Sequence, residues 1–269
     1  MSKASKDPME VPLSPDRVSY SIGTLLGADD FLDEQSYHRG RLARALSALH
    51  GGGTLAGLKV EWVKAAAGQE EELRLNPGLA IDRLGRLIEV PRRWCLRLQK
   101  WYDDQPEAQL RAAHNAAAGA VICDLFLQFE NCERGRTPSF ASTAFDGLSA
   151  TSASRYRDGF RLDLLPRTTP LSPNPQWPGL GPGATPDQVK DAILDVKFGA
   201  DFDGRNWTEL DEHKAGVDPL AVLLARVPIP ADVPGAAGKP ARRAQDVKPD
   251  NRVRRFAWPP SILARLTGL

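Results

Sequence analysis

Glu34 and His38 form the first pair of side chains whose types and spacing could carry chemistry. They lie four residues apart in a segment with helical periodicity, so both project from one face of a helix. A carboxylate and an imidazole placed in this way can bind a metal or exchange a proton. No H-E-x-x-H motif and no third ligand accompany them. We therefore interpret them as a polar pair that orients the helix.

A glycine-rich stretch follows this segment and could be taken for a phosphate-binding loop. Such loops precede a helix, whereas these glycines follow one, so we exclude a nucleotide site. We expect the His50 imidazole to cap the last carbonyls of the helix, with metal ligation as the alternative. We also expect a positive φ at one glycine or more, because the chain must reverse quickly before a strand near Leu58. The residues concerned are Gly51, Gly52, Gly53 and Gly57.

No nucleophile in the sequence has the partners that catalysis requires. Ser139 has no base nearby in the sequence, and no G-x-S-x-G motif occurs. The three cysteines lie in or beside predicted strands without zinc-site spacing, so we interpret Cys95, Cys123 and Cys132 as small buried thiols. We predict no catalytic, cofactor or metal site and a chain that is not an enzyme.

Two further groups are candidates for contacts rather than catalysis. Arg155 and Arg157 lie on a predicted strand, where they are expected to make ion pairs at an edge of the fold or at a subunit contact. Trp177 and Trp207 lie among prolines and glycines, which favours surface contact over burial in the core. If these two indoles lined a groove, the chain would instead be a carbohydrate- or surface-binding module, such as a fibre-associated protein.

The composition narrows the classes of partner. The 269 residues include 35 basic and 34 acidic side chains, giving a net charge of +1, so no bulk field attracts nucleic acid or an anionic membrane. There is no apolar run of 18 residues, so we expect no membrane span. The polar first residues do not resemble a secretory signal. We therefore expect the chain to be made in the cytoplasm.

A long helix is predicted from Asp29 to His50. Asp29 or Asp30 can cap its N-terminus, and arginines load its C-terminal half with positive charge, as the helix dipole prefers. Apolar and small residues recur at steps of three and four, and we expect this stripe to face the core. The stripe consists of Phe31, Gln35, His38, Leu42, Ala45, Leu46 and Leu49, and the arginines are Arg39, Arg41 and Arg44.

Strand signals dominate the rest of the chain. Leu73 to Pro91 has the alternation and turns of a tight meander, in which Asp82 and Gly85 bracket a hairpin turn. Residues 120–129 are almost continuously apolar, which predicts a strand in the centre of a sheet. Further strands are expected at 58–63, 94–98, 154–165, 220–229 and 251–256, and further helices at 106–118, 187–198 and 260–269.

The expected fold is α+β and β-dominated, either sandwich-like or a meander sheet, with the long N-terminal helix packed on the sheet. Four segments divide the chain. They are a flexible arm (1–18), a helix plus β-rich core (19–165), a Pro/Gly-rich insertion with a short helix (166–216), and C-terminal strands that complete the core before a closing helical turn (217–269).

The first 90 residues resemble the opening of proteins that accompany contractile injection systems and phage-tail-like particles. The likeness covers a Y-x-x-G-x-L-L-x-x-x-D-F-x-x-E-Q-x-Y-H-R-x-R-L pattern and then L-H-G-x-G-x-x-x-G-L-x-V. The matching residues include Tyr20, Gly23, Leu25, Leu26, Asp30, Phe31, Glu34, Gln35, Tyr37, His38, Arg39, Arg41, Leu42, Leu49, His50, Gly51, Gly53, Gly57, Leu58 and Val60.

This resemblance implies a structural or adaptor subunit of such a particle, at the baseplate or another terminal structure. Its partners would be other subunits of the particle, with several symmetric copies in the assembly. Assembly would occur in the cytoplasm, and the finished particle would be released or membrane-associated. The balanced charge, short strands and missing catalytic cluster suit a protein that works by docking.

Overall fold

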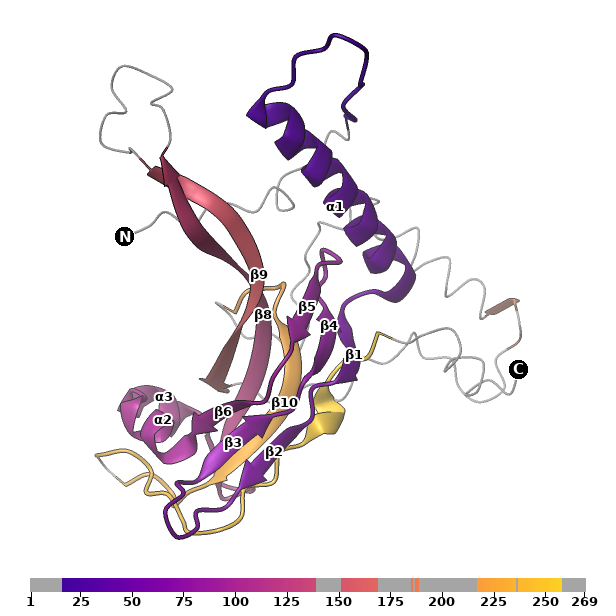
Figure 1. Cartoon of the computed structure of the whole chain (residues 1–269). Coiled ribbons are helices and arrows are strands. Elements are labelled where there is room, and N and C mark those ends of the chain that lie inside the picture. The colour runs from indigo at the N-terminus through magenta and orange to yellow at the C-terminus, as the bar shows by residue number, and fades with distance from the viewer. Residues whose placement is uncertain are drawn as a thin grey trace.

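The computed structural model describes residues 16–138, 151–168, 185, 187–188, 217–235 and 237–257. Within these ranges the chain is α+β and β-dominated, with a long helix at its N-terminal end, which confirms the expected fold class (Figure 1). Several predictions lie outside the described residues. They concern nearly all of the arm, most of the insertion with Trp177 and Trp207, and the closing helical turn.

The elements follow one another closely. The helices are α1 (Ala28–His50), α2 (Leu98–Asp104) and α3 (Glu107–Ala112), with a 3-10 turn η2 at Asn251–Val253. The strands are β1 (Gly53–Gly57), β2 (Val60–Val63), β3 (Glu72–Leu75), β4 (Gly78–Ile81), β5 (Leu87–Val90), β6 (Trp94–Arg97), β7 (His114–Asn115), β8 (Ala120–Pro138), β9 (Thr151–Pro166) and β10 (Val222–Pro230).

The described strands form three sheets in which every pairing is antiparallel. One sheet has the order β1-β4-β5, a second β2-β3-β6, and the third β10-β8-β7 with β9 also paired to β8. Asp82 and Gly85 close the β4–β5 hairpin as predicted, and Gly85 has a φ of 87°. We call these sheets together with α2, α3 and η2 the β body.

β8 is the central strand that the continuous apolar run predicted. Its first eight residues pair with β10 on one edge, and residues 123–138 pair with β9 on the other. Val121, Leu125 and Leu127 are almost fully buried, and they pack in one core cluster with side chains from β2 to β5. Burial on both faces of the strand explains why its sequence does not alternate.

Two local predictions were wrong. The Ala-rich helix expected at 106–118 ends at Ala112, since His114 and Asn115 pair with the start of β8. α2 was not predicted at all. Its Leu98 continues the alternation of β6, so the periodicity signalled a longer strand there.

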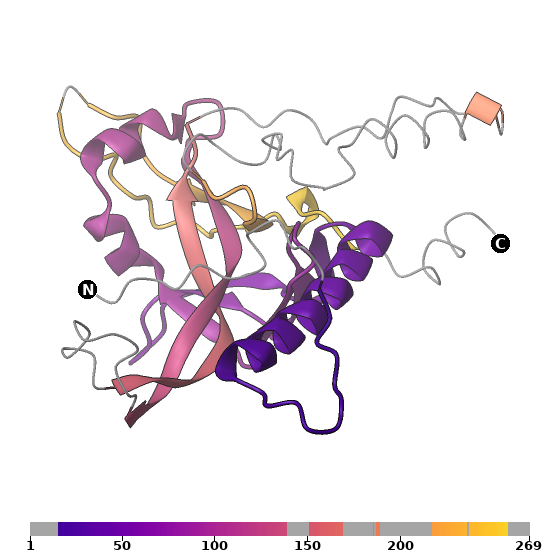
Figure 2. The same cartoon turned by 90° about the horizontal axis from the view of Figure 1, so that it is seen from above.

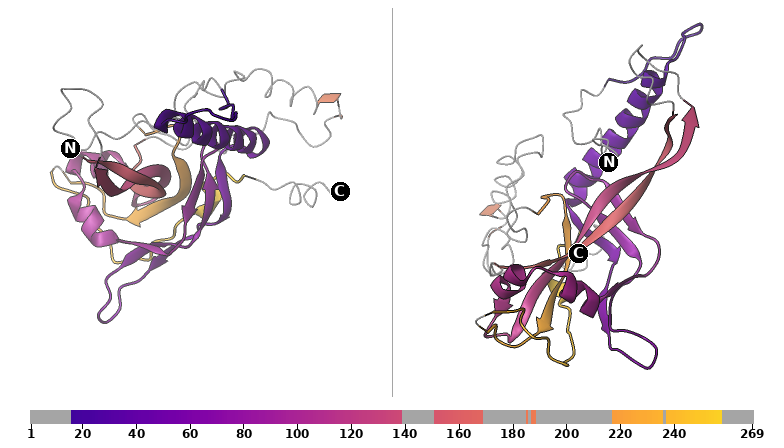
Figure 3. Two further views of the ribbon diagram at one scale, coloured as in Figure 1. Left: turned by 45° about the horizontal axis from the view of Figure 1, so that its top comes forward. Right: turned by 90° about the vertical axis from the view of Figure 1, so that its left-hand side faces the viewer.

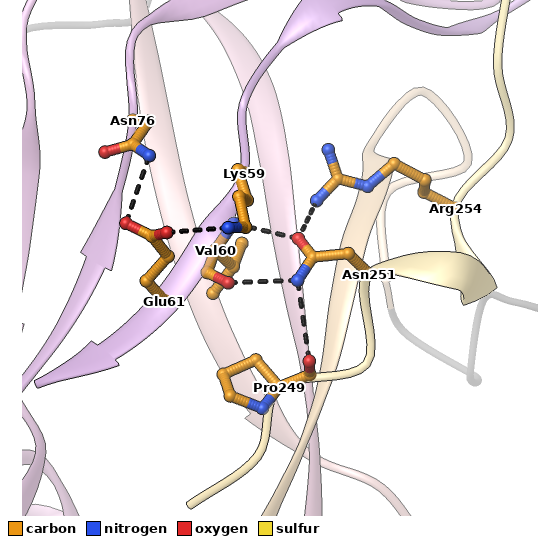
Figure 4. A network of polar contacts seen from close by, with 7 residues as sticks. All are labelled: Lys59, Val60, Glu61, Asn76, Pro249, Asn251 and Arg254. Carbon is orange, nitrogen blue, oxygen red and sulfur yellow. Dashed lines mark hydrogen bonds and ion pairs between the residues drawn. The ribbon is translucent and has the colours of Figure 1, made fainter.

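The strand expected at 251–256 is a 3-10 turn followed by an isolated bridge at Phe256. Here the Asn251 side chain makes the backbone hydrogen bonds that a neighbouring strand would make (Figure 4). The Asn251 amide accepts a hydrogen bond from the Val60 N–H at 2.8 Å and donates to the Val60 carbonyl at 2.9 Å. Arg254 donates to Asn251 and, at 2.8 Å, to the Leu58 carbonyl. Burial lowers the pKa of Arg254 to about 10.

Two cysteines lie elsewhere than expected. Cys123 is buried as predicted, but Cys95 and Cys132 are exposed. Cys95 occupies the outward position of β6, where Trp94 and Leu96 take the inward ones, and Cys132 lies on β8 beyond the core. Leu87 is exposed, whereas its neighbour Ile88 is buried, because alternation along β5 turns Ile88 and Val90 inward together.

Two elements project from the same end of the β body. One is α1, whose N-terminal end lies away from the sheets, and the other is the outer part of the β8–β9 hairpin (Figures 1 and 3). Seen from above, α1 lies along one side of the β body and not across its centre (Figure 2). We call residues 130–138 and 151–159, which pair only with each other, the β8–β9 arm.

Candidate interaction surfaces

α1 contacts the β body through its smallest residues. Gly40 and Ala43 are its buried positions. They lie over the turn of the β4–β5 hairpin, where a Cβ added at Gly85 would come within 1.8 Å of the Ala43 carbonyl oxygen. The Ser47 hydroxyl donates to the Arg83 carbonyl at 2.9 Å. The two backbones therefore lie in close contact at this point, and there is no room for a large side chain between them.

The predicted core-facing stripe of α1 faces solvent, so that prediction was wrong. Phe31, Leu42 and Leu49 are 54%, 63% and 76% exposed. The periodicity located an apolar stripe correctly, but it carried no information about which face the hairpin turn would accept. We call the exposed part of this stripe the α1 seam. It consists of Phe31, Gln35, His38, Leu42, Ala45 and Leu49.

The segment leading into α1 adds to this apolar surface. Tyr20, Ile22 and Leu25 are exposed, Ile22 and Leu25 almost completely. The Asp30 carboxylate accepts a hydrogen bond from the Gly27 N–H at 2.7 Å, which caps the helix as the sequence predicted. Large apolar groups concentrated on one helix and its leader are typical of a protein–protein contact.

The polar residues of α1 interact along the helix. His38 Nε2 lies 2.8 Å from Glu34 Oε1, and the Arg41 guanidinium lies over the Tyr37 ring at 5.4 Å. Tyr37 and His38 also make an edge-on ring contact. Glu34 and His38 thus pair with each other along the helix, where the His38 side chain is exposed and that of Glu34 is half-buried. Arg39 lies half-buried on the same helix.

The helix ends in the expected glycine-rich turn. The cap is the Gly51 N–H, which donates to the Ser47 carbonyl at 2.9 Å, while His50 Nδ1 is buried without a hydrogen-bond partner. Gly51, Gly53 and Gly57 have φ values of 67°, 154° and 64°. The residues after the turn form β1, a strand that the sequence did not predict. A Cβ at Gly57 would lie 2.2 Å from the Pro77 carbonyl oxygen, so the glycine permits the close approach of two strands.

The β8–β9 arm carries Arg155 and Arg157. In the ladder, Arg155 lies opposite Arg134 and Arg157 opposite Cys132. Both arginines are exposed, as is Tyr156 between them, so the arm presents a polar surface on both faces. Side chains alternate between the faces of a ribbon, which places Arg155 and Arg157 on one face and Tyr156 on the other.

The sequence analysis did not predict the buried charges of the β body. Asp124 on β8 accepts from Arg167 at 2.6 Å and from Arg226 at 3.0 Å, and all three side chains are mostly buried. Asp82 pairs with Arg86 at 2.6 Å, although burial raises the pKa of its carboxyl. Partners from distant strands give no local signal in a sequence, so no pattern identifies the Asp124 cluster. Within the described ranges, no three metal-ligating side chains gather in one place.

None of the helices in the described part of the chain has the length and apolar character needed to cross a bilayer. Several charges of the β body lie in ion pairs, such as those of Asp124 with Arg167 and Asp82 with Arg86. We take the α1 seam and the β8–β9 arm as the candidate interaction surfaces of the described part of the chain.

Comparison with known proteins does not identify a family for this chain. No model of a known protein family matches the sequence, and no curated protein matches it. A solved structure described as the baseplate complex from the type VI secretion system aligns with 94% of this chain at 11% identity and a TM-score of 0.32. The alignment spans 64% of that chain, less than two thirds of its length. At this TM-score the likeness carries no argument.

Proposed function

We propose that this chain is a non-enzymatic structural subunit of a contractile, phage-tail-like injection particle, at the baseplate or another terminal structure. It acts by docking to other subunits through the α1 seam and the β8–β9 arm. The observation that carries the proposal is the exposure of Phe31, Leu42 and Leu49 on a helix whose opposite side is fixed to a closed β body.

The sequence resemblance supports this role, and its matching residues can be located in the structure. Its helical half contains the α1 seam except Ala45, together with Glu34, Arg39 and Arg41. Its glycine half contains the turn that connects α1 to β1. The resemblance thus covers both the exposed surface of α1 and the glycine-rich turn that sets the direction of α1 relative to the β body.

The paired charges of the β body support a structural role over a catalytic one. Asp124 and Asp82 each meet an arginine at 2.6 Å, so neither carboxylate is available to a substrate. Glu34 and His38 pair with each other at 2.8 Å along α1, and the His38 side chain is exposed to water. The chain is proposed to assemble in the cytoplasm with several copies in each particle.

Particle purification tests the proposal. Particles isolated from the source organism and analysed by mass spectrometry should contain this chain at a fixed ratio to the other structural subunits. A Phe31→Glu/Leu42→Glu variant should be folded but absent from particles. Val233→Glu, which places the same charge at an exposed apolar position outside α1, should be incorporated normally. Incorporation of both variants, or no particle containing the wild-type chain, would count against the proposal.

An activity assay tests the non-enzymatic part. Purified protein should produce no turnover of peptidoglycan or simple glycans, with or without divalent metal. Turnover that is lost in Glu34→Gln or His38→Gln, with the fold intact, would overturn this part. Saturable glycan binding without turnover would favour the carbohydrate-binding alternative.

A further inference from the structure

The α1 seam has the spacing of a coiled coil. From Phe31 to Leu49 its residues follow one another at steps of 4, 3, 4, 3 and 4. This is the 3-4 spacing of the inner positions of a heptad repeat, where one helix packs against another. The face towards the β body, which contains Gly40 and Ala43, lies on a different side of the helix. The seam can therefore accept a second helix while α1 stays attached to its own β body.

The charges of α1 make the helix complementary to itself. Asp29, Asp30, Asp33 and Glu34 lie in its N-terminal half, and Arg39, Arg41 and Arg44 lie in its C-terminal half. An identical helix in the antiparallel orientation places each acidic half beside a basic half. A parallel neighbour places like charges together over the whole length, although it still permits contact between Glu34 and Arg39 of the other helix.

We propose that the α1 seam binds the α1 seam of a second copy of this chain, with the two helices antiparallel across a two-fold axis. The proposal deepens the docking role proposed above by naming the occupant of the seam. With the axis between Ser36 and Tyr37, Phe31 of each copy packs on Leu42 of the other. Gln35 of each copy meets His38 of the other in the two layers between, so two polar layers separate the two apolar ones.

This arrangement also gives the flanking charges partners. Glu34 and Arg41 flank the seam on the same side, so Glu34 of each copy lies beside Arg41 of the other. Within one helix these residues are seven positions apart, a rise of about 10 Å, which is too far for an ion pair. Coupling between positions 34 and 41 therefore reports contact between copies.

The leading segment completes the contact. In the same alignment, residues near position 24 of one copy come level with Leu49 of the other. The exposed Ile22 and Leu25 of each copy then lie beside the exposed Leu49 at the base of its neighbour's helix. α1 rises away from the β body, so the two β bodies lie at opposite ends of the helix pair (Figure 1). A single contact thus covers apolar groups along the whole helix and its leader.

A charge-exchange experiment on the full chain tests this proposal. The oligomeric state of the isolated protein is measured by sedimentation equilibrium from the low to the high micromolar range. The wild-type chain should form dimers. Glu34→Arg and Arg41→Glu should each weaken the dimer about tenfold or more, because each replaces two attractive contacts with two repulsive ones. An equimolar mixture of the two variants should recover a one-to-one heterodimer, which native mass spectrometry identifies by mass.

Two further variants separate the seam from general effects. Leu42→Glu should abolish the dimer, whereas Val233→Glu should leave it unchanged, and the far-ultraviolet circular dichroism of both should match the wild type. A chain that stays monomeric at every concentration, a trimer, or a dimer unaffected by Leu42→Glu would overturn the proposal. So would recovery by a mixture of Glu34→Arg with Arg39→Glu in place of Arg41→Glu, since that pair reports parallel helices.

These outcomes are distinct from those for the proposed function. Dimers of the isolated chain with no incorporation into particles would support the helix pairing and reject the particle role. Incorporation of a chain that is monomeric in isolation would do the reverse, and would assign the α1 seam to a different subunit.

Discussion

The β body and α1 place charged and apolar groups in opposite ways. In the β body, Asp124 and Arg167 are almost fully buried and paired with each other. On α1 the charged side chains of Asp33, Arg41 and Arg44 are exposed, as are Phe31, Leu42 and Leu49. A buried ion pair is tolerated only where its geometry is complete, and an exposed apolar stripe is common only where another molecule covers it.

This contrast shows which part of the chain buries its charged and apolar groups without another molecule. The β body pairs buried charges across long sequence distances, for example Asp124 with Arg226. α1 approaches the β body most closely at Gly40, Ala43 and Ser47, where its side chains are small. Variants that remove a buried charge or the close approach should cost much stability, whereas variants on the α1 seam should cost almost none.

The largest effect is expected at Asp124. Asp124→Ala leaves the buried Arg167 and Arg226 without their shared carboxylate, and should lower the free energy of unfolding by about 3–5 kcal/mol. Asp163→Ala is the control, because it removes a partner of Arg161 in a pair that is partly exposed, and should cost less than about 1 kcal/mol. Urea unfolding measures both. Equal losses would contradict the distinction between a closed β body and its surface.

The contact between α1 and the β body should be the next most sensitive. Gly85→Ala adds a Cβ at a φ of 87° and within 1.8 Å of the Ala43 carbonyl oxygen, so it should cost about 2–3 kcal/mol and speed amide exchange in α1. Gly68→Ala is the control, since its φ of 78° is equally strained but no atom lies within 4 Å. Thermal unfolding that is shifted by the same amount in both variants would show that α1 does not rely on this approach.

A smaller effect is expected at Glu71, which tests the paired charges through pH. Burial alone would raise the pKa of its carboxyl, but hydrogen bonds from Arg242 and Trp62 and the charge of Arg242 lower it overall. A lowered pKa in the folded state stabilises the protein above the ordinary value of 4.5, and this contribution is lost as the pH falls through the folded-state pKa. Glu71→Gln should therefore flatten the acid side of the stability curve.

Glu70 provides the control for that measurement. It lies next to Glu71 but pairs with Arg97 at the surface, where both side chains are about two thirds exposed. Glu70→Gln should leave the curve of unfolding free energy against pH close to that of the wild type. If the two variants give the same curve, the charge pairs of the β body do not differ from surface pairs.

The smallest effect is expected on the α1 seam. Leu42→Glu should change the unfolding free energy by less than about 0.5 kcal/mol, measured at a concentration at which the chain is monomeric. Ala43→Leu, one residue along, should cost about 1–3 kcal/mol because the buried Ala43 has no room for a larger side chain. Chemical denaturation that shows the larger loss at Leu42 would place the seam in the core and refute its assignment as a surface.

The sequence predicted those parts of the fold whose signals are local. The continuous apolar run from Ala120 requires burial on both faces, and β8 is buried on both. The turn at Asp82–Gly85 and the limits of α1 follow from glycines and caps, which act within a few residues. These features could be predicted because neighbours in the chain decide them.

The rest depends on contacts between distant residues. Periodicity located the α1 stripe, but the glycine turn at Gly85 determines which face of the helix is buried, and no pattern within the helix records it. Asn251 replaces a strand residue because Val60 lies beside it in space, 191 positions away in the chain. For the same reason the sequence placed Glu34 and His38 one turn apart on α1, but it did not predict that the apolar stripe of α1 faces solvent.

The length of β8 has a mechanical consequence. The strand has 19 residues, about 60 Å when extended, and it runs without interruption from the centre of the β body to the β8–β9 arm. Its hydrogen bonds to β9 and β10 lie across the strand direction. A pull along the arm therefore loads many of these bonds together in shear, whereas a sideways force would open them one after another. Tension applied to the arm would therefore be transmitted along β8 to the centre of the molecule.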